Sequence, residues 1–376
     1  MFKINKKEKK LADLITNKSV KPKTPDINKT SKAIKKTFDR LGLKVNMGDV
    51  YIGPRVTQYT FTPKRKTRVA DFDGVDKDIA LSTGARSVKM EIPVPGTSFG
   101  GIEIPNLEVG TTALGDLFKN KNFDINSKDL IIPFGVDTLG KPEYVDFINL
   151  PHLLIGGAVS SGKTSFINSV IISLMCKFVP DELQFLLVDP RRVEMSIYND
   201  TQYLLRPVIT DVKKTLNALK WTVAEMERRF ETLSNKSKIN IVEYNKCAKE
   251  KLPYIFFVVD ELADVMCVAA AEAEANIIKL SQMARAVGIH MVLATQRPSK
   301  DVLSGLMKAN ITSRLAFSTA SKDDSEVILD MSGAEHLLGV GDALFISPEL
   351  ARPKRLQIPF VSDEEIERVV ARTKTD

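Results

Sequence analysis

The segment that most constrains the fold is Gly157-Ala158-Val159-Ser160-Ser161-Gly162-Lys163-Thr164, which matches the pattern GxxxxGK[ST] without deviation. An apolar run at 153–155 predicts a strand entering the segment, and residues 165–175 predict a helix leaving it. Backbone N–H groups and the positive helix end then face a bound phosphate. We therefore expect an ATP-binding P-loop from Gly157 to Ser165, with Lys163 at the β and γ phosphates and Thr164 on Mg²⁺. A chance glycine-rich turn is the alternative.

The chain after residue 150 alternates apolar runs with helical segments. These runs are HLLIGG, LQFLLVDP, YIFFVVDE, HMVLATQ and RLAFST. Continuous apolar strands indicate a sheet that is covered on both faces, and strands alternating with helices indicate parallel βα units. Residues 151–376 are therefore predicted to form an α/β core of the doubly wound kind, with its longest helix at about 212–233.

The first 150 residues differ from the rest of the chain in composition and in the spacing of their apolar residues. Residues 1–30 are rich in lysine and poor in large apolar groups, which predicts a flexible basic arm. Residues 31–120 combine a helical pattern with short alternating stretches and predict a small α+β domain. Residues 121–150 are interpreted as a connecting segment that contains a hairpin with its turn at 139–142.

Two acidic residues, Asp260 and Glu261, end the apolar run that begins at Tyr254. In P-loop hydrolases a carboxylate at this place orients the Mg²⁺ shell and a second one polarises the attacking water. We expect Asp260 to do the first and Glu261 the second. The alternative is an acid-rich helix N-terminus, which the helix dipole favours without any catalytic role.

Two further residues are expected near the nucleotide. Gln296 follows the apolar run 290–295, so it lies at the carboxyl edge of the predicted sheet, where it can sense the γ-phosphate or cap a loop. Arg314 opens the run RLAFS and can reach a neighbouring subunit's nucleotide as an arginine finger. An ion pair within its own subunit is the competing explanation for Arg314.

Composition excludes several classes of protein. The chain has 376 residues, a net charge of +7 and 43% hydrophobic residues, which favours a globular protein with a polyanionic partner. Its three cysteines are scattered and its three histidines do not cluster, so neither disulfides nor a zinc site is expected. No run approaches 18 apolar residues and the N-terminus has no hydrophobic signal core, so we expect a cytoplasmic protein without a membrane segment.

Several short segments, in order, resemble the FtsK/SpoIIIE family of DNA translocases. In the smaller domain they are Gly53-Pro54-Arg55-Val56-Thr57, Ile92-Pro93-Val94-Pro95-Gly96 and Gly101-Ile102-Glu103-Ile104-Pro105-Asn106. In the larger domain they include Leu187-Val188-Asp189-Pro190-Arg191, Ala284-Arg285-Ala286-Val287-Gly288-Ile289-His290, Ala294-Thr295-Gln296-Arg297-Pro298 and Leu338-Gly339-Val340-Gly341-Asp342. The resemblance covers about residues 31–365.

This resemblance implies a RecA-like P-loop motor domain behind a smaller FtsK-like α domain. It also implies a homo-oligomeric ring, expected to be hexameric, that encircles double-stranded DNA and couples ATP hydrolysis to its movement in chromosome or plasmid segregation or DNA transfer. The sequence departs from the family at Arg191, where lysine is usual, and at Glu326, where arginine is usual. We also expect this chain to lack the family's membrane anchor and its winged-helix γ domain.

The residues that contact DNA are harder to predict, because phosphate contacts need only a few positive charges. The expected contacts are Lys300, Lys308, Arg352, Lys354 and Arg355, although each of them can equally belong to a solvated face. The basic arm, residues 1–30, can contribute further to DNA binding or can serve only to keep the chain soluble. Alternative functions are a related ring ATPase for conjugative single-stranded DNA or protein secretion, and a nucleotide-dependent DNA-binding scaffold.

Overall fold

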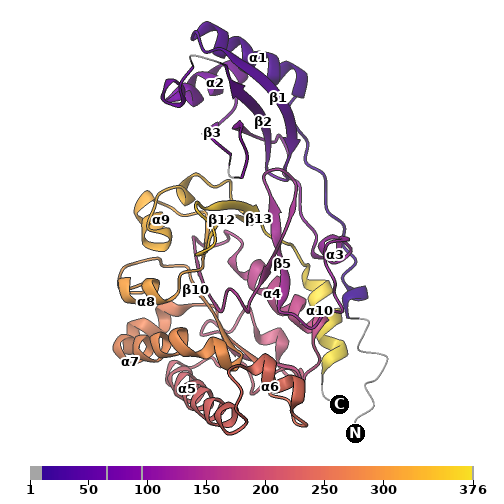
Figure 1. Cartoon of the computed structure of the whole chain (residues 1–376), viewed down its shortest axis with the longest axis vertical. Helices are drawn as coiled ribbons and strands as arrows, with labels where there is room; N and C mark the ends of the chain where they lie inside the picture. The colour runs from indigo at the N-terminus through magenta and orange to yellow at the C-terminus, as the bar shows by residue number, and fades with distance from the viewer. Residues whose placement is uncertain (1–10, 65–66, 95, 375–376) are drawn as a thin grey trace.

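The computed structural model describes residues 11–64, 67–94 and 96–374, and within them the chain forms two sheets. A smaller N-terminal domain stands on a larger one along the long axis of the molecule (Figure 1). The larger domain holds both the predicted P-loop and the predicted acidic pair. This arrangement confirms the predicted α/β fold with a smaller α+β domain in front of it.

The smaller domain is an antiparallel sheet covered by two helices. Its elements are α1 (Ile27–Arg40), β1 (Val45–Ile52), β2 (Val56–Pro63), α2 (Val75–Thr83), β3 (Lys89–Glu91) and β4 (Gly100–Pro105). The strand order is β1-β2-β4-β3. Phe38 of α1, Phe61 of β2 and Phe72 pack together in its core, with the rings of Phe38 and Phe61 centred 5.0 Å apart.

The larger domain is built on a nine-stranded sheet within the described residues, in the order β6-β5-β13-β12-β11-β7-β10-β9-β8. The strands are β5 (Ile131–Asp137), β6 (Pro142–Asp146), β7 (His152–Gly156), β8 (Leu183–Val188), β9 (Tyr254–Val259), β10 (Ile289–Thr295), β11 (Arg314–Phe317), β12 (Asp342–Ile346) and β13 (Lys354–Gln357). The half from β11 to β8 is parallel, as predicted. The half from β12 to β6 is antiparallel, so the sheet is mixed.

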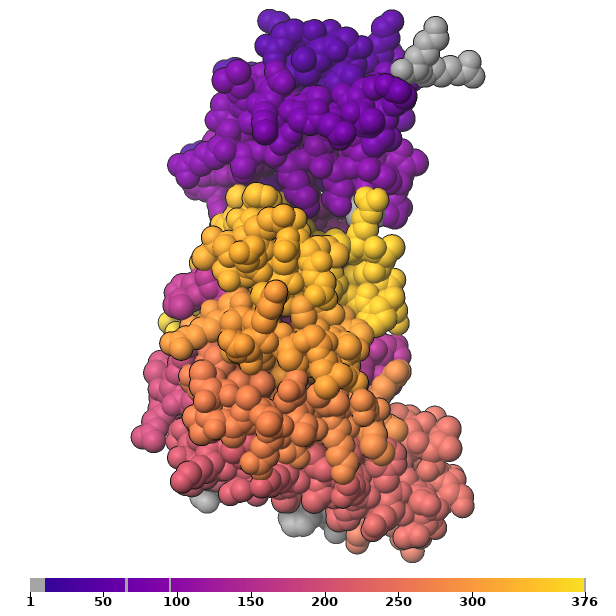
Figure 2. Space-filling model, turned by 90° about the vertical axis from the view of Figure 1, so that its left-hand side faces the viewer, coloured from indigo at the N-terminus to yellow at the C-terminus, as the bar shows by residue number. Residues whose placement is uncertain are grey.

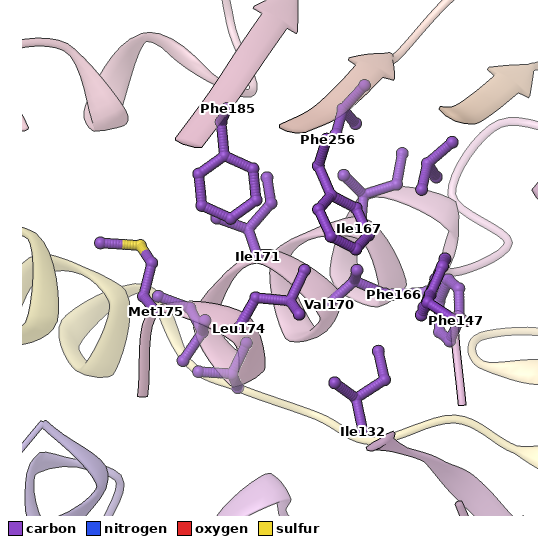
Figure 3. Packing of buried hydrophobic residues seen from close by; sticks show 14 of the residues in the cluster. Ile132, Phe147, Phe166, Ile167, Val170, Ile171, Leu174, Met175, Phe185 and Phe256 are labelled. Carbon is purple, nitrogen blue, oxygen red and sulfur yellow. The ribbon is translucent and has the colours of Figure 1, made fainter. Parts of the chain in front are cut away.

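Helices cover both faces of this sheet. They are α3 (Leu114–Phe118), α4 (Lys163–Lys177), α5 (Val212–Asn235), α6 (Ile241–Cys247), α7 (Leu262–Met283), α8 (Gly305–Asn310), α9 (Lys322–Leu329) and α10 (Asp363–Thr373). On β7, Leu153 and Ile155 join the core around α4, whereas Leu154 joins the core of α5 and α7. Figure 3 shows the α4 side, where Ile171 of the helix lies beneath Phe185 of β8. Burial on both faces explains why the parallel strands are apolar throughout.

The N-terminal segment corrects the prediction of an arm over residues 1–30. Residues 1–10 lie outside the described part, but residues 11–19 pack on the larger domain, residues 20–23 pair with residues 108–111, and α1 begins at Ile27. Leu11 and Ile15 are buried in the α4 core. The Glu365 carboxylate of α10 accepts the backbone N–H groups of Thr16 and Asn17 at 2.6 and 2.7 Å. The prediction rested on the many lysines of this segment and overlooked Leu11 and Ile15, two apolar residues at helical spacing.

The division between the domains also falls earlier than the predicted residue 120. The core of the smaller domain ends at Ile104 on β4, and Leu114 and Phe118 of α3 already belong to the core of the larger domain. The predicted connecting segment, 121–150, supplies β5 and β6, which extend the large sheet through β13. The hairpin predicted there is present, and Gly140 donates its N–H to Asp137 O in the turn.

Candidate nucleotide-hydrolysis site

The loop from β7 to α4 has the backbone that its glycines predict. Gly157 and Gly162 adopt positive φ angles of 149° and 115°. A Cβ atom on Gly157 would lie 2.7 Å from Phe317 Cβ, and one on Gly162 would lie 2.6 Å from Gly341 N. Both positions therefore exclude other residues, because the φ angle and the neighbouring atoms forbid a side chain. Helix α4 starts at Lys163, so its free N–H groups point into the loop.

The Lys163 side chain is folded against this loop. Its Nζ donates to Gly157 O at 2.7 Å, to Ala158 O at 2.5 Å and to Ser161 Oγ at 3.4 Å. Burial lowers the pKa of Lys163 to about 8, although the carboxylates of Glu261 and Asp260 oppose the shift. A bound phosphate supplies stronger, charged acceptors than these carbonyl oxygens, so it favours both the charged ammonium and its turn toward the ligand.

Asp260 lies at the carboxyl end of β9 and is buried. Its Oδ2 atom has no hydrogen-bond partner among the described residues. Burial, together with the nearby Asp189, Glu194 and Glu261 carboxylates, raises the pKa of Asp260 to about 7, against the effect of Arg191. A buried carboxyl group with a free oxygen in such surroundings is suited to a divalent cation, which would favour its ionised form.

Magnesium fits this donor set. No group of three or more His, Cys, Asp or Glu residues in the described part of the chain could hold a metal by itself. Mg²⁺ commonly takes only one or two protein oxygens and completes its octahedron with waters and substrate phosphates. The residues that would hold it are Asp260 and Thr164, the first residue after the P-loop lysine.

Glu261 is the N-cap of α7 and is held from several sides. Its Oε1 accepts from Thr295 Oγ1 at 2.7 Å and from Ala263 N at 3.2 Å. Its Oε2 accepts from Gln296 N at 3.1 Å and from the Arg191 guanidinium at 2.9 Å. The side chain is only 1% exposed. Hydrogen bonds to both oxygens therefore fix the carboxylate at the start of α7.

The loop after β8 contributes two residues to which sequence reasoning gave no role. Asp189 is fully buried and accepts the backbone N–H groups of Arg191, Arg192, Glu194 and Met195. These bonds fix the turn from which Arg191 reaches Glu261. Because β8 neighbours β9 in a parallel sheet, the two strand ends meet at one edge, and that rule could have indicated the contact.

Gln296 follows β10, the strand between β7 and β9. Its backbone N–H donates to Glu261, while its side-chain Oε1 is buried without a hydrogen-bond partner in the described residues. The residue therefore lies between the P-loop and the acidic pair, as its position after the strand predicted. An unpaired buried amide oxygen costs free energy, which a bound water or ligand donor would offset.

Arg314 differs from the expected arginine finger. It is buried, and its guanidinium donates to Asp330 Oδ2 at 2.5 Å, to Ile328 O at 3.2 Å and to Lys308 O at 3.1 Å. The contacts favour the competing explanation, an internal ion pair, because a group that reaches a neighbour's nucleotide must extend from the surface.

The five basic residues expected on DNA separate into two groups. Arg355 is nearly buried between Asp342 and Glu103, Lys354 pairs with Glu143, and Lys308 pairs with Asp330. These ion pairs within the chain argue against the three residues as DNA contacts, although Lys308 shares Asp330 with Arg314. Lys300 and Arg352 are exposed and remain predicted contacts.

Comparison with known proteins places these residues in a family context. A sequence profile of the FtsK/SpoIIIE family matches residues 113–300, and a profile of the FtsK alpha domain matches residues 10–106. The chain is 42% identical over 364 residues to the DNA translocase FtsK of Bacillus anthracis, covering 94% of this chain and 46% of that protein. It is 42% identical over 355 residues to the DNA translocase SpoIIIE of Bacillus subtilis strain 168, covering 92% and 45%. The chain thus spans less than half the length of these relatives.

Solved structures show the same fold at lower identity. The pCW3 conjugation coupling protein TcpA, in a monomer form with ATPγS, matches with a TM-score of 0.62 and 22% identity, over 91% of this chain and 99% of that one. The cytoplasmic domain of the type VII secretion ATPase EccC of Thermomonospora curvata matches with a TM-score of 0.59 and 22% identity, over 71% and 35%. No helix in the described residues is long and apolar enough to cross a bilayer.

Proposed function

This chain belongs to the FtsK/SpoIIIE family, and from that membership we propose that it hydrolyses ATP to drive itself along double-stranded DNA. The observation that carries the proposal is one sheet edge at which the P-loop follows β7, Gln296 follows β10, and Asp260 and Glu261 follow β9. Those groups are the set that ATP hydrolysis requires: a phosphate cradle, a cation ligand and a base.

In the proposed reaction, the P-loop N–H groups bind the ATP phosphates and Lys163 donates to the β and γ oxygens. Thr164 and Asp260 would hold Mg²⁺, which would neutralise the negative charge that develops on the phosphate oxygens. Glu261 orients the water that attacks the γ-phosphorus and accepts its proton, while the bond from that phosphorus to the bridging oxygen breaks and ADP leaves. Gln296 reports the γ-phosphate to Glu261, because its backbone N–H already donates to that carboxylate at 3.1 Å.

We propose duplex DNA as the polymer that is moved, on three supports. Both relatives described above are named DNA translocases, the similarity extends through the smaller domain, and the net charge is +7. Lys300 and Arg352 are the proposed DNA contacts from the expected set, because both are exposed. A hexameric ring in the cytoplasm is the proposed working form.

The test is steady-state ATP hydrolysis at fixed salt, with linear duplex DNA, with single-stranded DNA and without DNA. Duplex DNA is expected to raise the rate several-fold more than single strands do. Glu261→Gln should lower kcat at least about 100-fold, because the base is lost, and Lys163→Ala should abolish turnover. Glu272→Gln, on the exposed side of α7 where Glu272 pairs with Lys220, should match the wild type.

The other outcomes of this assay separate the alternative functions. Stronger stimulation by single strands would replace the duplex motor with a conjugative coupling role. A rate that ignores DNA would replace it with protein transport or a nucleotide-dependent scaffold.

A further inference from the structure

The P-loop is in direct contact with a second loop, 338–342, which leads into β12 and ends on the first residue of that strand. Gly341 donates its backbone N–H to Ser161 O at 2.8 Å. A Cβ atom on Gly162 would lie 2.6 Å from Gly341 N and 2.9 Å from Gly341 Cα. No side chain separates the two loops at this point, so a displacement of Gly341 toward Gly162 would press on the phosphate-binding backbone.

Arg55 of the smaller domain holds this loop from the other side. It lies between β1 and β2, and its NH1 group donates to Leu338 O at 3.2 Å. Its Nε donates to Gln357 Oε1 at 2.6 Å. Gln357 lies against the same loop, because a Cβ atom on Gly341 would meet its Nε2 at 2.5 Å. Arg55 therefore fixes the start of the loop and its packing partner.

A buried charge network makes the second connection between the domains. Arg355 of β13 donates through Nε and NH2 to Asp342, at 3.0 and 2.6 Å, and through NH1 to Glu103 of the smaller domain. Asp342 closes the loop by accepting Leu338 N at 2.8 Å. The three charged side chains are at most 9% exposed. Breaking the Arg355 to Glu103 contact would leave buried charge without its partner, so the network resists separation.

The rest of the junction is open on one side. A cavity of about 950 Å³ lies between the domains, lined by Asp73, Lys77 and Arg86 of the smaller one and by His336 and Arg352 of the larger one. Figure 2 shows the smaller domain seated on the part of the chain coloured orange to yellow. A tilt of the smaller domain about this junction would therefore act on the contacts of Arg55 and Glu103 and on loop 338–342.

We infer that Arg55 and Glu103 are positioning residues through which the smaller domain sets the nucleotide affinity of the P-loop. Neither lies at the phosphate-binding loop. Arg55 acts through Leu338 and Gln357, Glu103 acts through Arg355 and Asp342, and both routes meet at loop 338–342. The smaller domain thereby couples its own position to nucleotide binding, and the coupling is reciprocal. This inference rests on the proposed function, because it concerns the same nucleotide site.

The experiment measures binding of mant-ADP with Mg²⁺, and the KM and kcat for ATP, in Glu103→Gln and Arg55→Met. Each variant is expected to weaken mant-ADP binding and raise KM at least fivefold, the lower end of typical coupling between sites, with kcat within about twofold of wild type. Matched controls in the same domain are Glu108→Gln and Arg40→Met, whose ion pairs are exposed. Both controls should bind mant-ADP as the wild type does.

Thermal unfolding of each variant identifies those that are folded at the assay temperature. The two variants remove separate connections between the domains. A folded Arg55→Met therefore tests the inference even if Glu103→Gln unfolds, and a folded Glu103→Gln tests it even if Arg55→Met unfolds. Wild-type affinity in a folded variant, or an equal loss in the controls, would overturn the inference and leave the proposed function standing. Failure of the wild type to bind mant-ADP would overturn both.

Discussion

At the scale of single residues, burial decides the state of the titratable groups more than charge does. His152 and His290 lie in neighbouring strands, and desolvation lowers their pKa values to about 3 and about 4. The backbone N–H of Met291 donates to His152 Nδ1 at 3.1 Å, and the His290 ring stacks on Phe256 at 5.0 Å. Both imidazoles are therefore neutral core groups.

These two histidines predict how stability depends on pH. Their ordinary pKa is 6.5, so below that pH the unfolded chain takes up protons that the folded chain refuses until pH 3 to 4. The contribution of these histidines to the free energy of unfolding should therefore be fully present above pH 6.5. It should fall on acidification by up to about 1.4 kcal/mol per pH unit for each histidine. Urea unfolding at pH 7 and pH 5 measures this loss.

The control separates these histidines from the carboxylates, which also titrate in acid. The double variant His152→Gln, His290→Gln should lose at least about 1 kcal/mol less than the wild type between the two pH values. His336→Asn, where the side chain is 79% exposed, should keep the wild-type loss. Equal losses in all three proteins would contradict the assignment.

At the scale of elements, the packing of the N-terminal segment is the feature that composition obscured. Leu11 is 4% exposed and Ile15 is 1% exposed, and both lie in the core around α4. The segment also provides backbone N–H groups to Glu365 in the first turn of α10. It therefore ties the start of the described chain to its last helix.

The prediction for this element is a loss of stability on truncating one side chain. Leu11→Ala should lower the free energy of unfolding by about 2 to 5 kcal/mol, because it leaves a cavity in the core. Leu81→Ala, at a site that is 82% exposed on α2, should change it by less than about 0.5 kcal/mol. A Leu11→Ala protein as stable as the control would show that the segment does not pack as described.

Sequence reasoning succeeded where a local pattern fixes the element and failed where long-range pairing decides it. The P-loop strand and helix, the buried β9 and the long α5 each follow from a continuous apolar or helical pattern. The joining of β5 to β13 could not be predicted, because these strands are more than 200 residues apart in sequence and β13 has only four residues.

The same distinction holds in the site. The edge that carries Asp260, Glu261 and Gln296 follows from the parallel strand order, whereas the internal partners of Arg314 and Arg355 do not follow from local sequence. Arg355 meets Glu103 of the other domain, a contact that no periodicity encodes. Clusters of basic residues are therefore poor guides to DNA contacts until their internal partners are known.

At the scale of the whole molecule, the two domains meet at the loop that touches the phosphate-binding backbone. The smaller domain reaches loop 338–342 through Arg55, and that loop donates to Ser161 of the P-loop. A motor must connect nucleotide state to the movement of its parts, and this junction provides a short physical path for that connection. In the proposed motor, ATP binding would act on the smaller domain through these contacts.

The most direct test of the central claim is displacement of a third strand from duplex DNA. A triplex-forming oligonucleotide is bound to one end of a linear duplex, and its release is followed after adding protein and ATP. The wild-type protein should displace the third strand with ATP and should not displace it with ADP. The Lys163→Ala variant should not displace it even with ATP. ATP hydrolysis that duplex DNA stimulates, with the third strand left in place, would contradict translocation.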